Sequence, residues 1–444
     1  LRFNSGSSDY LSRTPSIAGN RKTYTLSWWM KIASIGTDRQ IIQIRVDTNN
    51  RFNITLTDAD KISFQDVSGG TRYGHTTDSL FRDPSAWYHF VVRVDTTQST
   101  DSNRLRIYAN NVEQSLTAIL AGYPPQDHDT LLNSTNETFI GKVANGSSDL
   151  NGYIAEMVLV NGQSLDPTSF GEFDSTTGIW KPKKIGQQFA AGGGAGTNGV
   201  YLDFKDSSNL GNDASGNNND FTVNNLTSID QSTDTCVENF VTLNPLAQTT
   251  TKLTLREGNL DAERPGSTAG WLAIGGTLGV SSGKWYYEYK VTDAGTPNQG
   301  CAIGWVNYDL ANFQNSSSTD FNILGAMVWY SRGNIFSNGT NAGGGNYSTY
   351  EEDTLMFAID IDNGYCYFGK NGTWENSGDP TSGSSGTGGV QITSTILGTN
   401  GTYSPAVAHR EDGQGQANFG NPPYSISSGN SDANGHGNFE YAPP

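Results

Sequence analysis

Apolar and polar residues alternate over short stretches along most of the chain. In the first half, this alternation marks five segments: Thr23–Lys31 (TYTLSWWMK), Trp87–Asp95 (WYHFVVRVD), Arg104–Ala109 (RLRIYA), Thr138–Gly141 (TFIG) and Gly152–Val160 (GYIAEMVLV). A period of two puts alternate side chains on opposite faces of an extended strand. Asn110-Asn111 directly after one of these segments is a tight-turn signal. The first half is therefore predicted to form an antiparallel β-sandwich or barrel.

The second half repeats this pattern with other residues. Four of its predicted strands are Lys284–Val291 (KWYYEYKV), Cys301–Val306 (CAIGWV), Thr354–Ile361 (TLMFAIDI) and Tyr365–Gly369 (YCYFG). Asp362-Asn363-Gly364 separates the last two and is a hairpin signal. A second antiparallel sandwich is expected here.

The region between the halves is rich in Gly, Asn, Ser and Asp. It contains AAGGGAG at 190–196 and a polar stretch at 207–220, with one short apolar strand predicted at Val200–Phe204. Such composition is typical of a linker. We therefore expect a first domain at 1–180, a connector at 181–250, a second domain at 251–425 and an extended or frayed tail at 426–444.

Composition narrows the class of protein. Charged residues make up 16% of the chain, against roughly 25% in an average soluble protein, and Gly accounts for 53 of 444 residues. The net charge of −17 argues against binding nucleic acid, whose phosphates are held by Lys and Arg. No apolar run approaches the roughly 18 residues of a membrane span. The three Cys lack metal-ligand spacing and suggest no disulfide framework. The chain begins at Leu1 with no signal-peptide pattern, so it is expected to be a fragment or a processed product.

The order of segments in the first half resembles a laminin-G/pentraxin-type jelly roll of the concanavalin A-like class. The resemblance is carried by SDYLSRTP (Ser8–Pro15), YTLSWWMK (Tyr24–Lys31), AWYHFVVRVD (Ala86–Asp95) and LNGYIAEMVLVNGQSL (Leu150–Leu165). It covers about residues 1–180 and implies a two-sheet sandwich.

The second half resembles a SPRY domain, another two-sheet sandwich. The matching segments are SGKWYYEYKV (Ser282–Val291), AIGWV (Ala302–Val306), DTLMFAIDIDNGYCYFGKNG (Asp353–Gly372) and ANFG (Ala417–Gly420). The resemblance covers about residues 250–425. FGKNG stands where the family usually has a "fyKNG" pattern.

This pair of domains, joined by DTCVENFVTLNP (Asp234–Pro245), resembles tail-fibre or other virion appendage proteins of marine bacteriophages. The resemblance implies a location on the virion surface, outside the cell. It implies as partners a glycan or protein of the host cell surface and other virion proteins. It also implies a homo-oligomer, most commonly a trimer, although the chain has no heptad or collagen repeat.

Carboxylates are the candidate groups for hydrolytic chemistry, because the concanavalin A-like sandwiches that the first half resembles also house glycosidases. Such enzymes need two carboxylates at a set separation. Glu351 with Asp353 and Asp360 with Asp362 have a suitable i, i+2 spacing, but both pairs fall at predicted turns. Glu156 is a single carboxylate, and His409 is expected in an exposed loop. The chain is therefore predicted not to be an enzyme and to have no catalytic residues.

Calcium was considered for the first domain, because laminin-G and pentraxin-like relatives often bind it through loop oxygens. Candidate ligands are Asp9, Asn145 and Asp149, but Lys142 stands where carboxylates are expected. No cofactor is predicted, and calcium at these three residues stays open as an alternative.

Recognition of a partner is the remaining chemistry. By resemblance, the loops of the second domain at 307–321, 330–350, 372–389 and 408–415 form the partner surface. Aromatic and polar side chains in them could stack on a ligand or hydrogen-bond to it: Tyr308, Tyr330, Arg332, Tyr347, Trp374 and Arg410. Tryptophans within strands are expected in the cores, namely Trp28, Trp87, Trp285, Trp305 and Trp329.

The sequence thus favours a non-enzymatic virion protein that binds host-surface glycan or protein during adsorption, with weak sites strengthened by repetition on the particle. Two alternatives remain open. One is a structural decoration protein of capsid or tail without a ligand, and the other is a polysaccharide-degrading tailspike.

Overall fold

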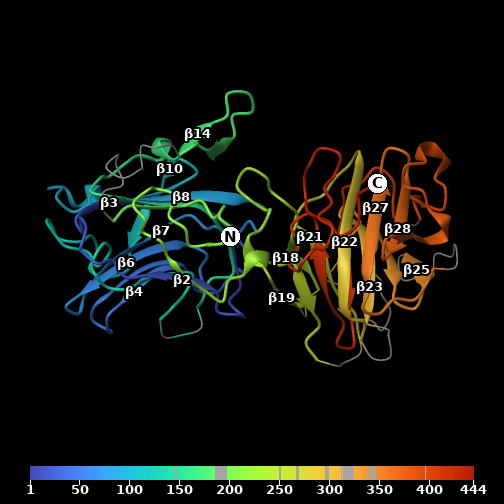
Figure 1. The fold of residues 1–444 in the computed structure, drawn as a ribbon, viewed down its shortest axis with the longest axis horizontal. Helices are drawn as coiled ribbons and strands as arrows, with labels where there is room; N and C mark the ends of the chain where they lie inside the picture. The colour runs from blue at the N-terminus through green and yellow to red at the C-terminus, as the bar shows by residue number, and fades with distance from the viewer. Residues whose placement is uncertain are drawn as a thin grey trace. The chain divides into compact units, whose positions relative to one another are not determined.

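The computed structural model describes residues 1–144, 146, 148–185, 198–249, 252–266, 270–295, 300–311, 313, 325–337, 340–341, 347–395 and 397–444. The chain divides into two compact units (Figure 1). The N-terminal unit comprises Leu1–Gln231 and Thr235–Asn239, and the C-terminal unit comprises Ser232–Asp234 and Phe240–Pro444. The described residues contain no α-helix, which confirms the all-β prediction.

The N-terminal unit consists of two antiparallel sheets and a small hairpin. The β3 sheet runs in the order β1 (Arg2–Phe3), β13 (Gly152–Asn161), β3 (Thr23–Ile32), β8 (Trp87–Asp95), β9 (Leu105–Ala109) and β10 (Val112–Glu113), with β16 (Val200–Leu202) also on β13. The β5 sheet runs β11 (Leu116–Ala118), β7 (Thr71–Thr77), β6 (Ile62–Ser68), β5 (Arg51–Leu56), β4 (Arg39–Arg45), β12 (Thr138–Ile140), β2 (Tyr10–Arg13) and β17 (Thr222–Asn224). The hairpin pairs β14 (Gly171–Phe173) with β15 (Trp180–Pro182).

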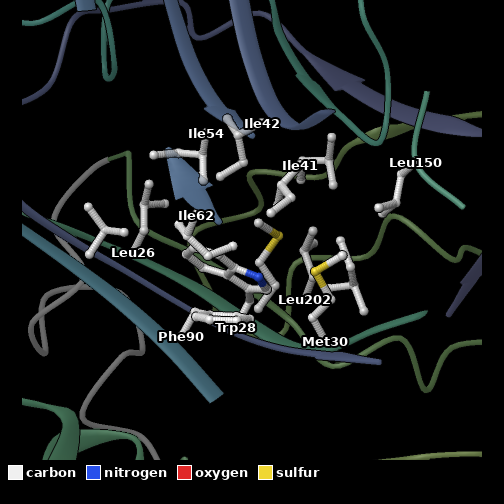
Figure 2. Packing of buried hydrophobic residues seen from close by; sticks show 14 of the residues in the cluster. Leu26, Trp28, Met30, Ile41, Ile42, Ile54, Ile62, Phe90, Leu150 and Leu202 are labelled. Carbon is white, nitrogen blue, oxygen red and sulfur yellow. The ribbon is translucent and has the colours of Figure 1, made fainter. Parts of the chain in front are cut away.

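The core of this unit lies between the two sheets and follows from the period-two pattern. Leu26, Trp28 and Met30 alternate along β3 and pack in one buried cluster with Ile42 of β4 and Ile54 of β5 (Figure 2). Trp28 has no exposed surface, and its ring lies 5.5 Å from that of Phe90. Burial of such side chains is the main favourable contribution to folding.

The expected connector is largely part of the N-terminal unit. β16 pairs with β13 through Tyr201 opposite Val158, and β17 pairs with β2. The polar stretch between β16 and β17 is ordered by Asp213, whose carboxylate accepts hydrogen bonds from the backbone N–H groups of Tyr201, Ser215 and Asn219. A Gly/Asn-rich composition suggested a linker, but Asp and Asn side chains satisfy backbone groups here and let the segment fold.

The C-terminal unit also consists of two antiparallel sheets. The β23 sheet runs β18 (Leu243–Gln248), β21 (Leu272–Gly276), β31 (Tyr403–His409), β23 (Cys301–Asn307), β24 (Ala326–Tyr330), β25 (Asn334–Ser337) and β26 (Thr340–Asn341). The β22 sheet runs β19 (Thr254–Arg256), β20 (Asp261–Glu263), β32 (Gln414–Asn418), β22 (Lys284–Asp293), β27 (Thr354–Asp360), β28 (Tyr365–Lys370) and β29 (Thr373–Trp374), with β30 (Val390–Gln391) on β28. Short 3-10 turns occur in the two units at η1 (Asp101–Asn103), η2 (Pro167–Ser169), η4 (Ser228–Asp230), η6 (Glu375–Ser377) and η7 (Gly383–Ser385).

The core of the C-terminal unit is rich in aromatic residues. Tyr287 of β22 stacks on Phe357 of β27 at 4.7 Å and meets Trp305 of β23 edge-on at 5.0 Å. Trp305 and Trp329 are buried, as expected, but Trp285 is 49% exposed and lies near the start of β22. The expectation for Trp285 was wrong, because alternation gives the face of a residue but not its distance from the end of the sandwich.

The C-terminal tail is folded rather than frayed. Glu288, a fully buried carboxylate on β22, accepts backbone N–H groups of Glu440 at 3.0 Å and Tyr441 at 2.7 Å. Phe439 is buried, and its ring meets that of Tyr286 at 5.2 Å. The low apolar content of the tail gave no sign that it packs on the domain. A buried carboxylate holds the tail through hydrogen bonds, and one aromatic ring supplies the apolar contact.

Candidate functional site

The outer face of the β23 sheet carries small residues in its centre. Ala302 and Gly304 of β23, Ala406 and Ala408 of β31, and Ala273 of β21 point away from the main core. A Cβ atom on Gly304 would lie 2.1 Å from the carbonyl oxygen of Met327 on β24, so only glycine permits this approach of the two strands. These alanines are themselves buried in a second hydrophobic cluster with Trp271, Phe313 and Val328, so this part of the face is covered.

At one end of this face, three aromatic rings and an arginine form a cluster. Trp271 precedes β21, Tyr330 ends β24 and Phe336 lies on β25; the Trp271 and Tyr330 rings are 5.6 Å apart, and the Tyr330 and Phe336 rings are 5.7 Å apart, both edge-on. Arg410, directly after β31, places its guanidinium 5.5 Å from the centre of the Trp271 ring. We call Trp271, Tyr330, Phe336 and Arg410 the aromatic–arginine cluster.

A strained turn supports this cluster. Glu411 and Asp412, between β31 and β32, have φ angles of 50° and 65°, which non-glycine residues adopt rarely. The Glu411 carboxylate pairs with the guanidinium of Arg410 and thereby orients it over Trp271. The same left-handed backbone occurs in ordinary turns of this chain, for example at Asn110 and Asn371, so it shapes the turn without marking a site.

Within the cluster Trp271 is buried, and the partly exposed groups are Tyr330, Phe336 and Arg410. Tyr330 is half-buried, and Arg332, two residues further along, is exposed. Burial raises the pKa of Tyr330, while the positive charges of Arg332 and Arg410 oppose this rise. The Tyr330 hydroxyl therefore stays protonated at neutral pH and can donate and accept hydrogen bonds beside two guanidinium groups.

The structure brings together some of the predicted site residues and separates others. Tyr330, Arg332 and Arg410 lie at the same end of the β23 sheet. Tyr308 folds over the sheet and donates its hydroxyl to the carbonyl of Gly276, and burial raises its pKa to about 12. Tyr347 is a core residue 5.9 Å from the rings of Trp329 and Phe368. Trp374 lies on the β22 sheet, 6.4 Å from the ring of Tyr286.

Sequence reasoning missed Trp271 and Phe336. Trp271 directly precedes β21, in which Leu272 and Ile274 face the core, while Ala273 and Gly275 face outward. The sequence does show a large aromatic residue with the same alternation as small residues that face outward. This pattern could have indicated Trp271 only if the outward face of the strand had been known.

A cysteine–histidine pair lies beneath the cluster. His409 is fully buried, which corrects the expectation of an exposed loop residue: it is the last residue of β31 and faces the core. Its Nδ1 lies 3.2 Å from the Cys301 sulfur, and its Nε2 lies 2.7 Å from the Tyr289 hydroxyl. Burial lowers the pKa of His409 to about 4 and raises the pKa of the Cys301 thiol, so both groups are neutral and enclosed. This pair supports packing rather than nucleophilic chemistry.

Two of the three candidate calcium ligands, Asp9 and Asp149, lie within the described residues and are engaged in hydrogen bonds of their own loops. Asp9 accepts the backbone N–H of Asn4 and the hydroxyl of Ser7, and Asp149 accepts the backbone N–H of Val143. Both carboxylates are buried and serve to close their own loops. Asn145 lies outside the described residues. Among those described, no group of three or more His, Cys, Asp and Glu side chains is placed to hold a metal ion.

The carboxylates of the two i, i+2 pairs lie at or next to turns, with Asp360 as the last residue of β27. Asp353 accepts the backbone N–H of Glu351, and Asp360 accepts the backbone N–H and side-chain amide of Asn363. Asp362 accepts the backbone N–H of Gly283. In each case the carboxylate accepts hydrogen bonds from the local backbone.

Comparison with known families identifies the class of both units. A family model of the concanavalin A-like lectin/glucanases superfamily, laminin-G type, matches residues 5–168. A SPRY domain model matches residues 284–421. The chain therefore combines one domain of each class, as the two resemblances implied.

Three solved structures illustrate the proteins to which this chain is similar. The chain is similar to the SPRY domain of human HERC1, with 14% identity, 39% of this chain and 96% of that chain covered, and a TM-score of 0.28. It is also similar to a putative carbohydrate binding protein from Bacteroides ovatus, with 14% identity, coverage of 49% and 56%, and a TM-score of 0.32. A third is the heptameric SAP-like pentraxin from Limulus polyphemus, with 12% identity, coverage of 35% and 71%, and a TM-score of 0.26. A search of curated proteins finds no match.

Among the described residues, no helix has the length and apolar character needed to cross a membrane.

Proposed function

We propose that the chain is a non-enzymatic surface protein of a bacteriophage virion, displayed on a tail fibre or similar appendage, that binds a glycan or protein of the host surface. The observation that carries the binding role is the aromatic–arginine cluster at one end of the C-terminal unit. It combines partly exposed aromatic rings with the guanidinium of Arg410, and the exposed Arg332 lies two residues beyond Tyr330. Such groups dominate binding energy at recognition surfaces.

The virion assignment is supported by the resemblance of the two-domain pair and its connector to phage appendage proteins. The non-enzymatic role is supported by the engagement of the Asp353, Asp360 and Asp362 carboxylates with backbone N–H groups. Association into a homo-oligomer, with a trimer as the first expectation, would present several weak sites together and increase avidity by about 10²–10⁴-fold.

The double substitution Tyr330→Ala and Arg332→Ala is expected to weaken binding of the protein to its host-surface receptor by about 30-fold, since loss of hot-spot residues costs about 2 kcal/mol or more. The measurement is a glycan array combined with an assay in which purified protein blocks virion adsorption. The control is Trp285→Ala, which removes an exposed tryptophan near the start of β22, away from the cluster. It should leave binding unchanged.

Three results would contradict the proposal in different ways. Equal blocking by the double variant and the unaltered protein would remove the cluster as the receptor site. Failure of the unaltered protein to bind cells or compete with virions would remove the adsorption role. Release of oligosaccharides from host polysaccharide would show an enzyme.

A further inference from the structure

Three arginines form a row on the outer face of the β5 sheet in the N-terminal unit. Arg45 on β4 is paired directly with Arg51 on β5, Arg51 with Val67 on β6, and Val67 with Arg72 on β7. Ile44, Phe52 and Phe64 belong to the core between the sheets. Because side chains alternate along a strand, the residues of the row on the same strands, at odd spacings from these three, face outward. The row crosses four adjacent strands, a width of about 14 Å. We call Arg45, Arg51 and Arg72 the arginine row.

The arginine row has little neutralising charge around it. None of its members forms an ion pair with a carboxylate among the described residues. Asp47 lies in the exposed turn between β4 and β5. Hydrogen bonds from Asn50 and Asn49 are the main causes that lower its pKa, and the positive charge of Arg45 lowers it further. Asp66 of β6 points into the sandwich and is fully buried.

The arginines repel one another. Burial lowers the pKa of Arg51, and the charges of Arg72 and Arg45 lower it further. Like charges at directly paired positions of a sheet destabilise the fold. Between Arg51 and Arg72, Val67 has no exposed surface, as expected where arginine stems lie along an apolar neighbour.

The adjoining row of outward residues is polar and uncharged. Gln43, Asn53 and Gln65 lie side by side on β4, β5 and β6, two residues along from the arginine row. Gln43 and Asn53 are buried: the Gln43 amide N–H donates to the Asn53 side-chain oxygen at 2.9 Å, and the Gln43 side-chain oxygen accepts the backbone N–H of Ala144 at 2.6 Å. These two amides are satisfied within the fold, so the arginine row, of which Arg72 is exposed and Arg45 and Arg51 are partly exposed, carries the groups that can meet an anionic ligand.

We propose that the arginine row is a binding site for the anionic groups of an acidic polysaccharide. A protein of net charge −17 repels a polyanion at long range, so binding requires a local positive site. Repeated negative groups along a polymer match a linear row of guanidiniums better than a single small anion does. The site rests on the proposed glycan-binding function and adds the class of glycan and a second contact surface.

The test measures binding of the intact protein to immobilised polygalacturonate, which bears carboxylates, to dextran sulfate, which bears sulfates, and to neutral dextran. The triple variant Arg45→Gln, Arg51→Gln, Arg72→Gln is expected to bind at least one acidic polymer more than about 10-fold more weakly than the unaltered protein, with a reduced dependence on salt. Which acidic polymer binds identifies the anionic group. Neutral dextran should not bind through this row.

The matched control is Arg106→Gln, an arginine on β9 that is paired with Glu113. It should leave binding unchanged. A structural role is distinguished by stability: removing mutual repulsion should leave the melting temperature of the triple variant unchanged or raise it, whereas residues needed for folding would lower it.

Equal binding of acidic polymer by the triple variant and the unaltered protein would overturn the inference, as would equal binding of neutral dextran and the acidic polymers. Failure of host adsorption with retained, arginine-dependent binding of an acidic polymer would overturn the virion role and leave the anion site standing. Loss of adsorption in the Tyr330 and Arg332 variant with unchanged polymer binding would separate the two sites.

Discussion

Replacing Trp28 with alanine is expected to lower the free energy of unfolding of the N-terminal unit by about 3–5 kcal/mol, the usual cost of removing a large aromatic side chain from a core. Trp28 has no exposed surface and packs among residues from both sheets, including Ile42, Ile54 and Phe90 (Figure 2). Because these neighbours lie on paired strands, they cannot move together to fill the space. A cavity therefore adds to the lost burial.

The matched variant Trp28→Phe should cost only about 1–2 kcal/mol, because it keeps an aromatic ring in the same place. The indole N–H of Trp28 has no hydrogen-bond partner among the described residues, so its removal costs no hydrogen bond. Urea unfolding followed by circular dichroism measures both variants. Only the transition of the N-terminal unit should shift. Equal losses for alanine and phenylalanine would show that the cavity is not the cause.

Much of the fold could be predicted from alternation. β3 and β22 begin at Thr23 and Lys284, the positions that the pattern indicates. Alternation could not show that the segment after residue 180 folds back onto β13 and β2, because its order depends on the Asp213 carboxylate rather than on apolar residues. The tail was missed for the same reason, since Glu288 holds it through backbone N–H groups.

The candidate site was harder to predict than the fold. Loop resemblance selected Tyr330, Arg332 and Arg410, which lie at one end of the C-terminal unit, but it also selected Tyr347, which is a core residue. The difference depends on packing between distant strands: Tyr347 contacts Trp329 and Phe368, whereas Tyr330 lies on the opposite face of β24 from Trp329. The arginine row was also invisible in the sequence, because register across four strands brings Arg45, Arg51 and Arg72 together.

Acid is expected to destabilise the N-terminal unit through His89. This residue of β8 is buried between two tryptophans: its ring stacks on Trp29 at 4.8 Å, and Trp180 of the β14–β15 hairpin lies at 5.9 Å. The Trp180 indole N–H donates to Nδ1 at 3.0 Å, and Nε2 lies 2.8 Å from the Ser27 hydroxyl. An indole only donates, so Nδ1 must accept and the ring must be neutral.

Burial lowers the pKa of His89 from 6.5 to about 3. Below pH 6.5 the unfolded chain takes up a proton that the folded chain excludes, so stability is lost as the pH falls and the loss levels off near pH 3. One pH unit corresponds to about 1.4 kcal/mol, so the loss from His89 reaches about 3 kcal/mol near pH 4.5. His409, with its pKa lowered to about 4, has the same sign in the C-terminal unit.

The measurement compares the unaltered protein with His89→Phe, which keeps an aromatic ring between the tryptophans but cannot titrate. Urea unfolding at pH 7 and at pH 4.5 gives the free energy of unfolding of the N-terminal unit, whose transition is identified by its shift in Trp28→Ala. The variant starts less stable at pH 7, because it lacks the hydrogen bonds to Ser27 and Trp180. It should then lose about 3 kcal/mol less than the unaltered protein on acidification. If both proteins lost the same free energy of unfolding between pH 7 and pH 4.5, His89 would not be held neutral. Its burial between Trp29 and Trp180 would then not be the cause of the acid sensitivity.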